Sequence, residues 1–174
     1  MLDVLIIGAG LSGIGAARHL QARCPSKRWA ILEARDDLGG TWDLFRYPGV
    51  RSDSDMYTLG YAFKPWTESK AIADGATILR YLREAADEAD ITSQIQFGQA
   101  VRQARWSTEE AAWTLDVETI KTGERSQFRT RFLYLCCGYY SYAEGHHPAF
   151  PDQDSFKGTL VYPQFWPADL DYAG

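Results

Sequence analysis

A glycine turn near the start of this 174-residue chain constrains its fold more than any other feature. The turn, GAGLSG at residues 8–13, follows the continuously apolar run at 4–7, which is typical of a parallel strand buried on both faces. Apolar and small residues then recur at helical spacing over 11–24, and a second strand pattern occupies 29–33. Strand, turn, helix and strand within about 30 residues predict a right-handed βαβ unit and therefore an α/β fold.

The residues of this turn have separate roles in dinucleotide binding. Gly8 makes the tight turn, Gly10 lets a pyrophosphate approach the backbone, and Gly13 permits close packing of helix on strand. Backbone N–H groups and the positive end of the helix dipole then face the phosphates. Ser12 either adds a hydroxyl donor or caps the helix. Glu33, unless it is only a solvated strand end, accepts hydrogen bonds from an adenosine ribose and repels a 2′-phosphate, which favours FAD or NAD over NADP.

The rest of the chain predicts a sheet with two kinds of strand. Short helices are expected within 52–63, and an amphipathic helix is expected over 76–89. Strand-like stretches at 95–106, 113–119 and 128–135 predict an antiparallel β-meander whose last strand rejoins the parallel sheet. The predicted fold is a Rossmann-like parallel sheet of the FAD/NAD(P)-binding type with an inserted antiparallel meander, forming an incomplete domain.

Composition bounds the partners and the location. The net charge of −5 is spread over the chain, so there is no electrostatic footprint for a nucleic acid or a membrane surface. The run at 4–7 is too short to span a bilayer, and we expect a cytoplasmic protein. Cys24, Cys136 and Cys137 lack metal-ligand spacing, so no metal site is expected and the thiols are interpreted as buried and free. Residues 1–140 are predicted to form the dinucleotide-binding domain, and 141–174 to form a linker at which the chain ends.

From Glu33 onward the sequence EARDDLGGTWDLFRYPGVRSDSD resembles class B flavin-containing monooxygenases of the Baeyer–Villiger type. Those enzymes share the glycine turn, the acidic residue at the second strand end, a G-G-T-W segment and a Y-P-G-x-x-x-D segment. The last two are present here as Gly39–Trp42 and Tyr47–Asp53. The resemblance covers nearly the whole chain and implies that it binds FAD.

The resemblance also implies roles for individual residues. It places Thr41 and Trp42 against the flavin, and it makes Gly40 a further cofactor-binding residue. It places Arg51 and Asp53 where flavin and nicotinamide meet, with Asp53 as the candidate catalytic residue, and Val101 where backbone groups hold the FAD adenine. Taken singly, Trp42 as a core residue and Asp53 as a helix cap are alternatives.

The stretch FKGTLVYPQFWP at 156–167 is similar to the linker fingerprint of the family, F-x-G-x-x-x-H-x-x-x-W-P, with Tyr162 in the histidine position. Leu59 is a second departure, where related enzymes often place a tyrosine. The resemblance implies the N-terminal part of an NADPH- and O2-dependent monooxygenase of small organic substrates, inactive alone as a fragment, with NADPH needed only in a full-length protein. The alternatives are a non-catalytic dinucleotide-binding module completed by a partner chain and a disulfide reductase, although no C-x-x-x-x-C pair is present.

Overall fold

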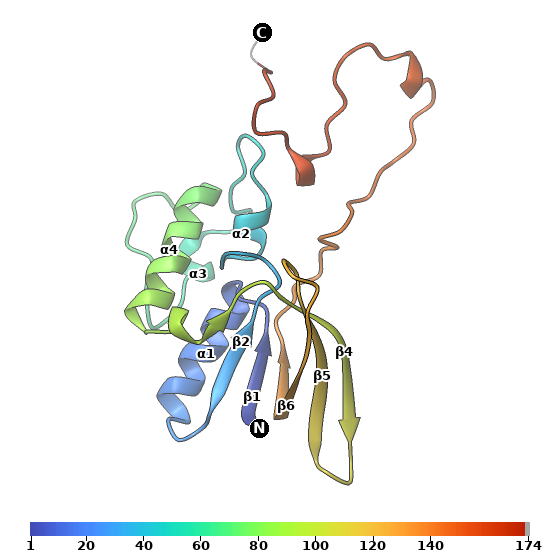
Figure 1. Ribbon diagram of the computed structural model, residues 1–174. Helices are drawn as coiled ribbons and strands as arrows, with labels where there is room; N and C mark the ends of the chain where they lie inside the picture. Colours follow the sequence, from blue (N-terminus) through green and yellow to red (C-terminus); the bar gives the residue numbers. More distant parts are fainter. Residues whose placement is uncertain (173–174) are drawn as a thin grey trace.

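The computed structural model describes residues 1–172, which form a six-stranded mixed sheet with the strand order β3-β2-β1-β6-β5-β4 (Figure 1). Strand β1 (Leu2–Ile7) pairs in parallel with β2 (Trp29–Leu32), and β2 pairs in parallel with β3 (Ile95–Gln96). Helix α1 (Leu11–Arg23) connects β1 to β2. The predicted βαβ unit is confirmed, and Glu33 is the first residue after β2.

The meander comprises β4 (Gln99–Ser107), β5 (Ala112–Thr119) and β6 (Arg125–Leu135), paired antiparallel in that order. Strand β6 then continues alongside β1 in parallel, with Phe132 opposite Val4. The prediction that the last strand of the meander rejoins the parallel sheet is therefore confirmed. The first half of β6 belongs to the meander and its second half to the parallel sheet.

The predicted strand over 95–106 is wrong in one respect, because the structure divides it into β3 and β4. The break falls at Phe97 and Gly98, and Gly98 adopts a φ of 67°, a left-handed conformation that favours glycine. Its backbone N–H donates to the carbonyl of Arg35 at 3.0 Å. The turn at Gly98 therefore ends the parallel sheet at β3 and starts the meander at β4.

Helix α4 (Gly75–Glu88) agrees with the predicted amphipathic helix, and α3 (Met56–Leu59) is one of the expected short helices. Helix α2 (Thr41–Leu44) is a single turn where the sequence indicated only a turn. Three short 3-10 turns complete the described elements: Thr92–Gln94, Gln153–Ser155 and Pro163–Phe165.

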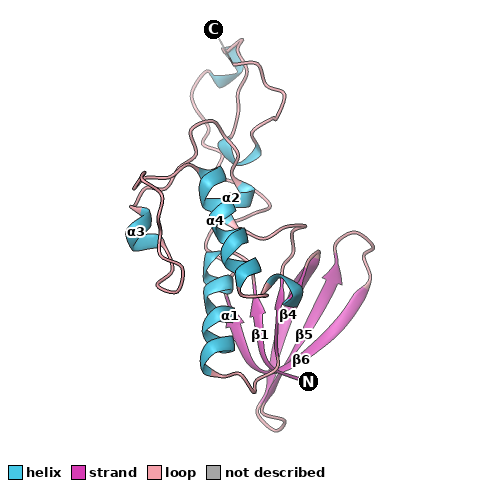
Figure 2. Cartoon of the chain, turned by 90° about the vertical axis from the view of Figure 1, so that its left-hand side faces the viewer, coloured by secondary structure: helices cyan, strands magenta, loops and turns pink. Residues whose placement is uncertain are grey.

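Two apolar layers cover the two faces of the parallel strands. Helices α1 and α4 lie against one face (Figure 2), where buried side chains of the strands and helices meet: Val4, Ile6, Ile14, Ile78 and Leu82. The meander packs on the other face through a second buried cluster: Leu5, Ala30, Leu32, Leu115 and Val117. Burial on both faces explains why the sequence of β1 is continuously apolar.

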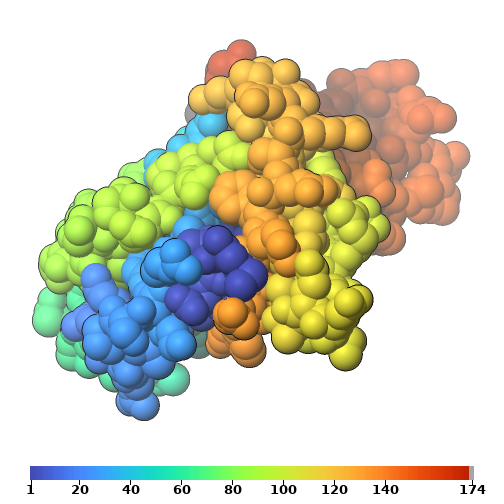
Figure 3. Space-filling view, turned by 60° about the horizontal axis from the view of Figure 1, so that its bottom comes forward, coloured from blue at the N-terminus to red at the C-terminus, as the bar shows by residue number. Residues whose placement is uncertain are grey.

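The two ends of β1 lie at opposite ends of the sheet. Its start is at the surface, between the blue atoms of the first residues after α1 and the orange atoms of β6 (Figure 3), and Met1 is 52% exposed. Its other end leads into the glycine turn, on the side toward α2 (Figure 1). The glycine turn therefore lies at the carboxyl ends of the parallel strands, the edge at which ligands generally bind in open α/β sheets.

After Leu135 the described residues form loops and short 3-10 turns, and this segment extends away from the sheet (Figure 1). Its hydrogen bonds include one from Gln164 Nε2 to the carbonyl of Ser141, at 2.7 Å, which joins two of its own residues. The division into a domain at 1–140 and a linker at 141–174 remains a prediction, and residues 173–174 lie outside the described part of the chain.

Candidate cofactor site

The glycine turn has the tight geometry that its sequence predicts. Gly8 has a φ of 104°, and a Cβ added to it would overlap the carbonyl of Cys136. A Cβ added to Gly13 would overlap the carbonyl oxygen of Gly8, so the helix packs directly on the turn. Gly10 is the N-cap of α1, and its lack of a side chain leaves the first N–H groups of the helix accessible. These donors and the helix dipole suit an anion such as a pyrophosphate.

Glu33 lies beside this turn and is 6% exposed. Its Oε2 accepts a hydrogen bond from the backbone N–H of Ala9 at 2.8 Å, and its Oε1 accepts one from Arg35 at 2.9 Å. Each carboxylate oxygen keeps a second lone pair, so the group remains an acceptor for ligand hydroxyls. Glu33 is a structural connection between the turn and the end of β2, as well as a candidate ribose ligand.

The G-G-T-W segment forms the wall opposite the turn. Gly39 and Gly40 have φ values of 121° and 55°, and the N–H of Gly39 donates to the carbonyl of Ala9 at 3.0 Å. A Cβ added to Gly10 would lie 3.5 Å from the Cα of Gly40, so the two backbones approach closely. Trp42 follows in α2 and packs partly against the helix-side core.

A cavity of about 460 Å³ lies between these elements, within the size range of cofactor sites. It brings together most of the residues predicted from the sequence: Gly8, Gly10, Ser12, Glu33, Gly40, Thr41, Trp42 and Val101. A larger hollow of about 760 Å³ lies on the outer face of the meander, lined largely by polar and charged side chains. In this hollow, Arg102 Nε forms an ion pair with Glu118 Oε2 at 3.2 Å, so these two charges neutralise each other. The first cavity, which contains the glycine turn and Glu33, is therefore the candidate cofactor site.

Burial suppresses the ionisation of several groups in the cavity wall. It raises the pKa of the Cys136 thiol to about 11. It also raises the pKa values of Cys137 and Tyr142, and the negative charge of Glu33 adds to both shifts. The interpretation of all three cysteines as buried is wrong for Cys24 and Cys137, which are exposed, whereas Cys136 is half-buried. Cys137 as a whole residue is exposed, but its Sγ lies 3.7 Å from the carbonyl oxygen of Ile7, and the raised pKa reflects these surroundings of the thiol. A raised pKa keeps the vicinal thiols protonated, unlike the activated thiol of a disulfide reductase.

The described residues 1–172 contain no helix long and apolar enough to cross a membrane. The same residues place no group of three or more His, Cys, Asp or Glu side chains where a metal ion would bind.

Comparison with known proteins agrees with this geometry. Residues 6–72 match the family described as an NAD(P)-binding Rossmann-like domain. Over 172 residues, the chain is 55% identical to the FAD-containing monooxygenase EthA of Mycolicibacterium smegmatis, in an alignment that covers 99% of this chain and 35% of the relative. The chain corresponds to the N-terminal part of class B FAD-containing monooxygenases. It spans about 35% of the length of the curated relatives it matches.

Solved structures of such monooxygenases share the fold. An oxidised steroid monooxygenase bound to NADP matches with a TM-score of 0.80 at 31% identity, over 99% of this chain and 33% of that one. OTEMO in complex with FAD and NADP matches with a TM-score of 0.76 at 31% identity, over 97% of this chain and 31% of that one. The predicted family and fold class are therefore confirmed.

Three predicted site residues, Gly13, Arg51 and Asp53, do not line the cavity. Gly13 acts in helix packing, as described above. Arg51 and Asp53 are exposed outside the cavity, and their place near the flavin and nicotinamide of a monooxygenase remains a prediction. The alternative of Asp53 as a helix cap is wrong, because Asp55 caps α3 by accepting from the backbone N–H of Thr58 at 2.9 Å.

Ser12 and Trp42 line the cavity, whereas Tyr162 lies outside it. Ser12 lines the cavity and is not the N-cap of α1, so the hydroxyl-donor interpretation remains. Trp42 lines the cavity and also contacts the core, which combines its two alternatives. Tyr162, in the histidine position of the monooxygenase fingerprint, stacks on the exposed ring of His147 with ring centroids 3.9 Å apart.

Sequence reasoning missed part of the cavity wall. Tyr139 and Tyr142 follow β6 and line the cavity, together with Gln99 at the start of β4. A tyrosine in an aperiodic segment carries no positional signal of its own. Cys137 and Gly138 also line the cavity, so the loop after β6 returns to the site.

Proposed function

We propose that this chain is the FAD-binding part of an NADPH- and O2-dependent monooxygenase that oxygenates a small organic substrate. The supporting observation is the cavity at the carboxyl ends of the parallel strands, where the glycine turn, Glu33 and α2 converge. The proposal retains the cytoplasmic location expected from the sequence. Bound FAD would supply the redox chemistry, accepting electrons from NADPH and activating O2 for oxygen transfer to a ketone, nitrogen or sulfur atom.

The residues of the cavity fit separate parts of FAD. The N-terminus of α1 after Gly10 would hold the pyrophosphate, with Ser12 as an additional hydroxyl donor. Glu33 would accept from the ribose hydroxyls. Backbone groups of Val101 would hold the adenine, and Thr41 and Trp42 of α2 would contact the flavin.

The 174 residues alone are proposed to bind FAD without turnover. They correspond to about 35% of the length of their curated relatives, so most residues of such an enzyme have no counterpart among these 174. A site that activates O2 has to exclude water, which requires enclosure of the flavin. Arg51 and Asp53, proposed for the place where flavin and nicotinamide meet, are exposed to solvent here.

Titration of the 174-residue chain with FAD, followed by its visible absorption, tests cofactor binding. We expect a saturable spectral shift that Gly10→Ala and Glu33→Ala each abolish or weaken at least about tenfold, which is about 1.4 kcal/mol. A wild-type chain that folds but gives no saturable shift would overturn the proposal.

Oxygen uptake with NADPH tests the second part of the proposal. We expect no uptake above that of free FAD from the 174 residues, even at saturating FAD. Sustained NADPH-dependent uptake by this chain alone would show that the other residues of the relatives are not needed.

The second candidate is a non-catalytic dinucleotide-binding module completed by a separate chain. Its supporting observation is an uncovered apolar surface on β6 beside α1, where Phe132 is 56% exposed and Tyr134 is 45% exposed. Co-purification of a nicotinamide-binding partner would favour this module. A monomer without bound nucleotide would count against it.

A further inference from the structure

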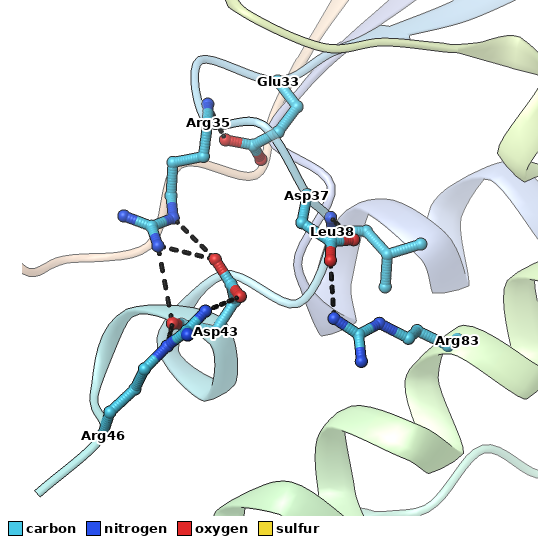
Figure 4. Close-up of polar contacts among 7 residues, drawn as sticks. All are labelled: Glu33, Arg35, Asp37, Leu38, Asp43, Arg46 and Arg83. Carbon is cyan, nitrogen blue, oxygen red and sulfur yellow. Dashed lines mark hydrogen bonds and ion pairs between the residues drawn. The ribbon is translucent and has the colours of Figure 1, made fainter. Parts of the chain in front are cut away.

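A buried carboxylate in α2, the helix that carries the cavity-lining Thr41 and Trp42, has two arginine partners (Figure 4). The side chain of Asp43 is 4% exposed, and its Oδ2 accepts from Arg35 Nη2 at 2.6 Å and from Arg35 Nε at 3.1 Å. Its other oxygen, Oδ1, accepts from Arg46 Nη2 at 2.8 Å. The cavity itself is lined by neither Asp43 nor the two arginines. This cluster therefore acts on the cofactor site only through the residues it holds.

A continuous series of polar contacts runs from the glycine turn to α2. The N–H of Ala9 donates to Glu33, Glu33 accepts from the backbone N–H of Arg35, and the guanidinium of Arg35 donates to Asp43. Asp43 belongs to α2, the same single turn as Thr41 and Trp42, which line the cavity. Three walls of the cavity are thus connected by three side chains.

Helix α2 depends on such external contacts. A helix of four residues cannot stabilise itself, because nucleation costs more than its few internal hydrogen bonds return. Its N-cap is Gly40, which provides no side-chain cap. A buried carboxylate is costly when unpaired, so Asp43 remains buried only while its arginine partners are in place. The orientation of α2 is therefore coupled to the Arg35–Asp43 pair.

We propose that Asp43 and Arg35 are positioning residues that hold α2 so that Thr41 and Trp42 face the cofactor. The inference rests on the proposed FAD function of the cavity, and it assigns a role to residues that do not themselves touch the cavity. Arg35 is the decisive partner, because it belongs to the segment after β2 and ties α2 to the sheet. Arg46 lies three residues after Asp43, in the segment that leaves α2, and its side chain is 70% exposed.

The two arginines therefore provide a matched comparison. We expect Arg35→Ala and Asp43→Asn each to weaken FAD binding at least about tenfold, as loss of a buried charge partner does, while Arg46→Ala weakens it less than about threefold. In the double variant, the losses from Arg35→Ala and Asp43→Asn should be less than additive, because both remove one interaction. Arg83→Ala, which removes an exposed ion pair with Asp37 (Figure 4), should leave FAD binding unchanged.

Amide hydrogen exchange without FAD provides an independent readout. We expect Arg35→Ala to accelerate exchange at Leu44 and Phe45, whose N–H groups donate within α2, by about tenfold or more, with no change at Ile78 in α4. Arg35→Ala leaves Asp43 paired with Arg46, so this variant retains the fold even if Asp43→Asn does not.

The outcomes separate the two proposals. Wild-type chain that binds no FAD would overturn the proposed function, and exchange at α2 would still test the pairing. Wild-type chain that binds FAD, with Arg35→Ala binding equally well or accelerating exchange as much at Ile78 as at α2, would overturn the positioning role.

Discussion

Gly10 and Gly13 lie in one turn, yet a methyl group at each would meet different surroundings. At Gly10 the nearest atom to an added Cβ is the Cα of Gly40 at 3.5 Å, an ordinary van der Waals distance, and the φ of −80° suits alanine. At Gly13 an added Cβ would overlap the carbonyl oxygen of Gly8. The absence of a side chain at Gly10 therefore leaves room for a ligand, whereas its absence at Gly13 is needed for the helix to pack on the turn.

We predict that Gly10→Ala retains the stability of the wild-type chain within about 0.5 kcal/mol, while Gly13→Ala lowers the free energy of unfolding by about 1–3 kcal/mol because of overpacking. Urea denaturation of the two variants checks this difference. Gly13→Ala serves as the control for Gly10→Ala. Equal stabilities of the two variants would contradict the assigned roles.

Cysteine reactivity is a second prediction at the residue scale. With a pKa of about 11, Cys136 has little thiolate at neutral pH, and it is also half-buried, whereas Cys24 is exposed. We expect Cys136 to be alkylated at pH 7.5 at least about tenfold more slowly than Cys24. Mass spectrometry after timed labelling measures both rates in one sample.

Labelling in concentrated urea is the control, because unfolding removes the burial of Cys136 and should bring the two rates together. Similar rates in the folded chain would mean that Cys136 is not shielded.

Helix α4 begins at an aspartate cap that provides a prediction at the scale of an element. Asp74 accepts from the backbone N–H of Thr77 at 2.9 Å, and this hydrogen bond holds its pKa below the usual value. Asp74→Ala should lower the free energy of unfolding by about 1 kcal/mol at pH 7. Asp74→Asn should nearly retain it, because asparagine caps helices equally well.

The pH dependence of this cap follows from the direction of the shift. A lowered pKa in the folded state means that the contribution is present above the pKa of the unfolded chain and is lost as pH falls through the folded value. The difference between wild type and Asp74→Asn should therefore change below about pH 4. Thermal unfolding from pH 3 to pH 7 measures it, and a constant difference would contradict the cap assignment.

The elements differ in how far the sequence predicted them. Helix α4 has apolar residues at helical spacing, and this pattern was sufficient to predict the helix. Helix α2 is one turn after two glycines of positive φ, and its conformation depends on Arg35 and Asp43, which no local pattern connects. The lining of the candidate cavity was predictable where a residue type serves one chemistry, as at Gly10 and Glu33. It was not predictable at Tyr142, whose place depends on the path of the chain after β6.

At the scale of the whole molecule, the segment after β6 provides a prediction about domain organisation. Limited proteolysis should cleave first within 141–172, because described hydrogen bonds there, such as that between Gln164 and Ser141, join residues of the segment to each other. The product ending near residue 140 should unfold at nearly the same temperature as the intact chain.

Mass spectrometry locates the first cleavage, and calorimetry compares the two species. First cleavage within the meander, or a large fall in unfolding temperature after removal of the segment, would contradict a domain at 1–140.

Strand β6 has a consequence for how the molecule unfolds. Thr130, fully buried, pairs with Trp113 of the meander and with Leu2 of the parallel sheet, so the two halves of the molecule share one uninterrupted backbone. Loss of β6 from either half removes a central strand from the other. The meander and the glycine turn should therefore unfold in one cooperative transition. A substitution that destabilises the meander would then also weaken FAD binding at the candidate site, although the meander forms only part of its wall.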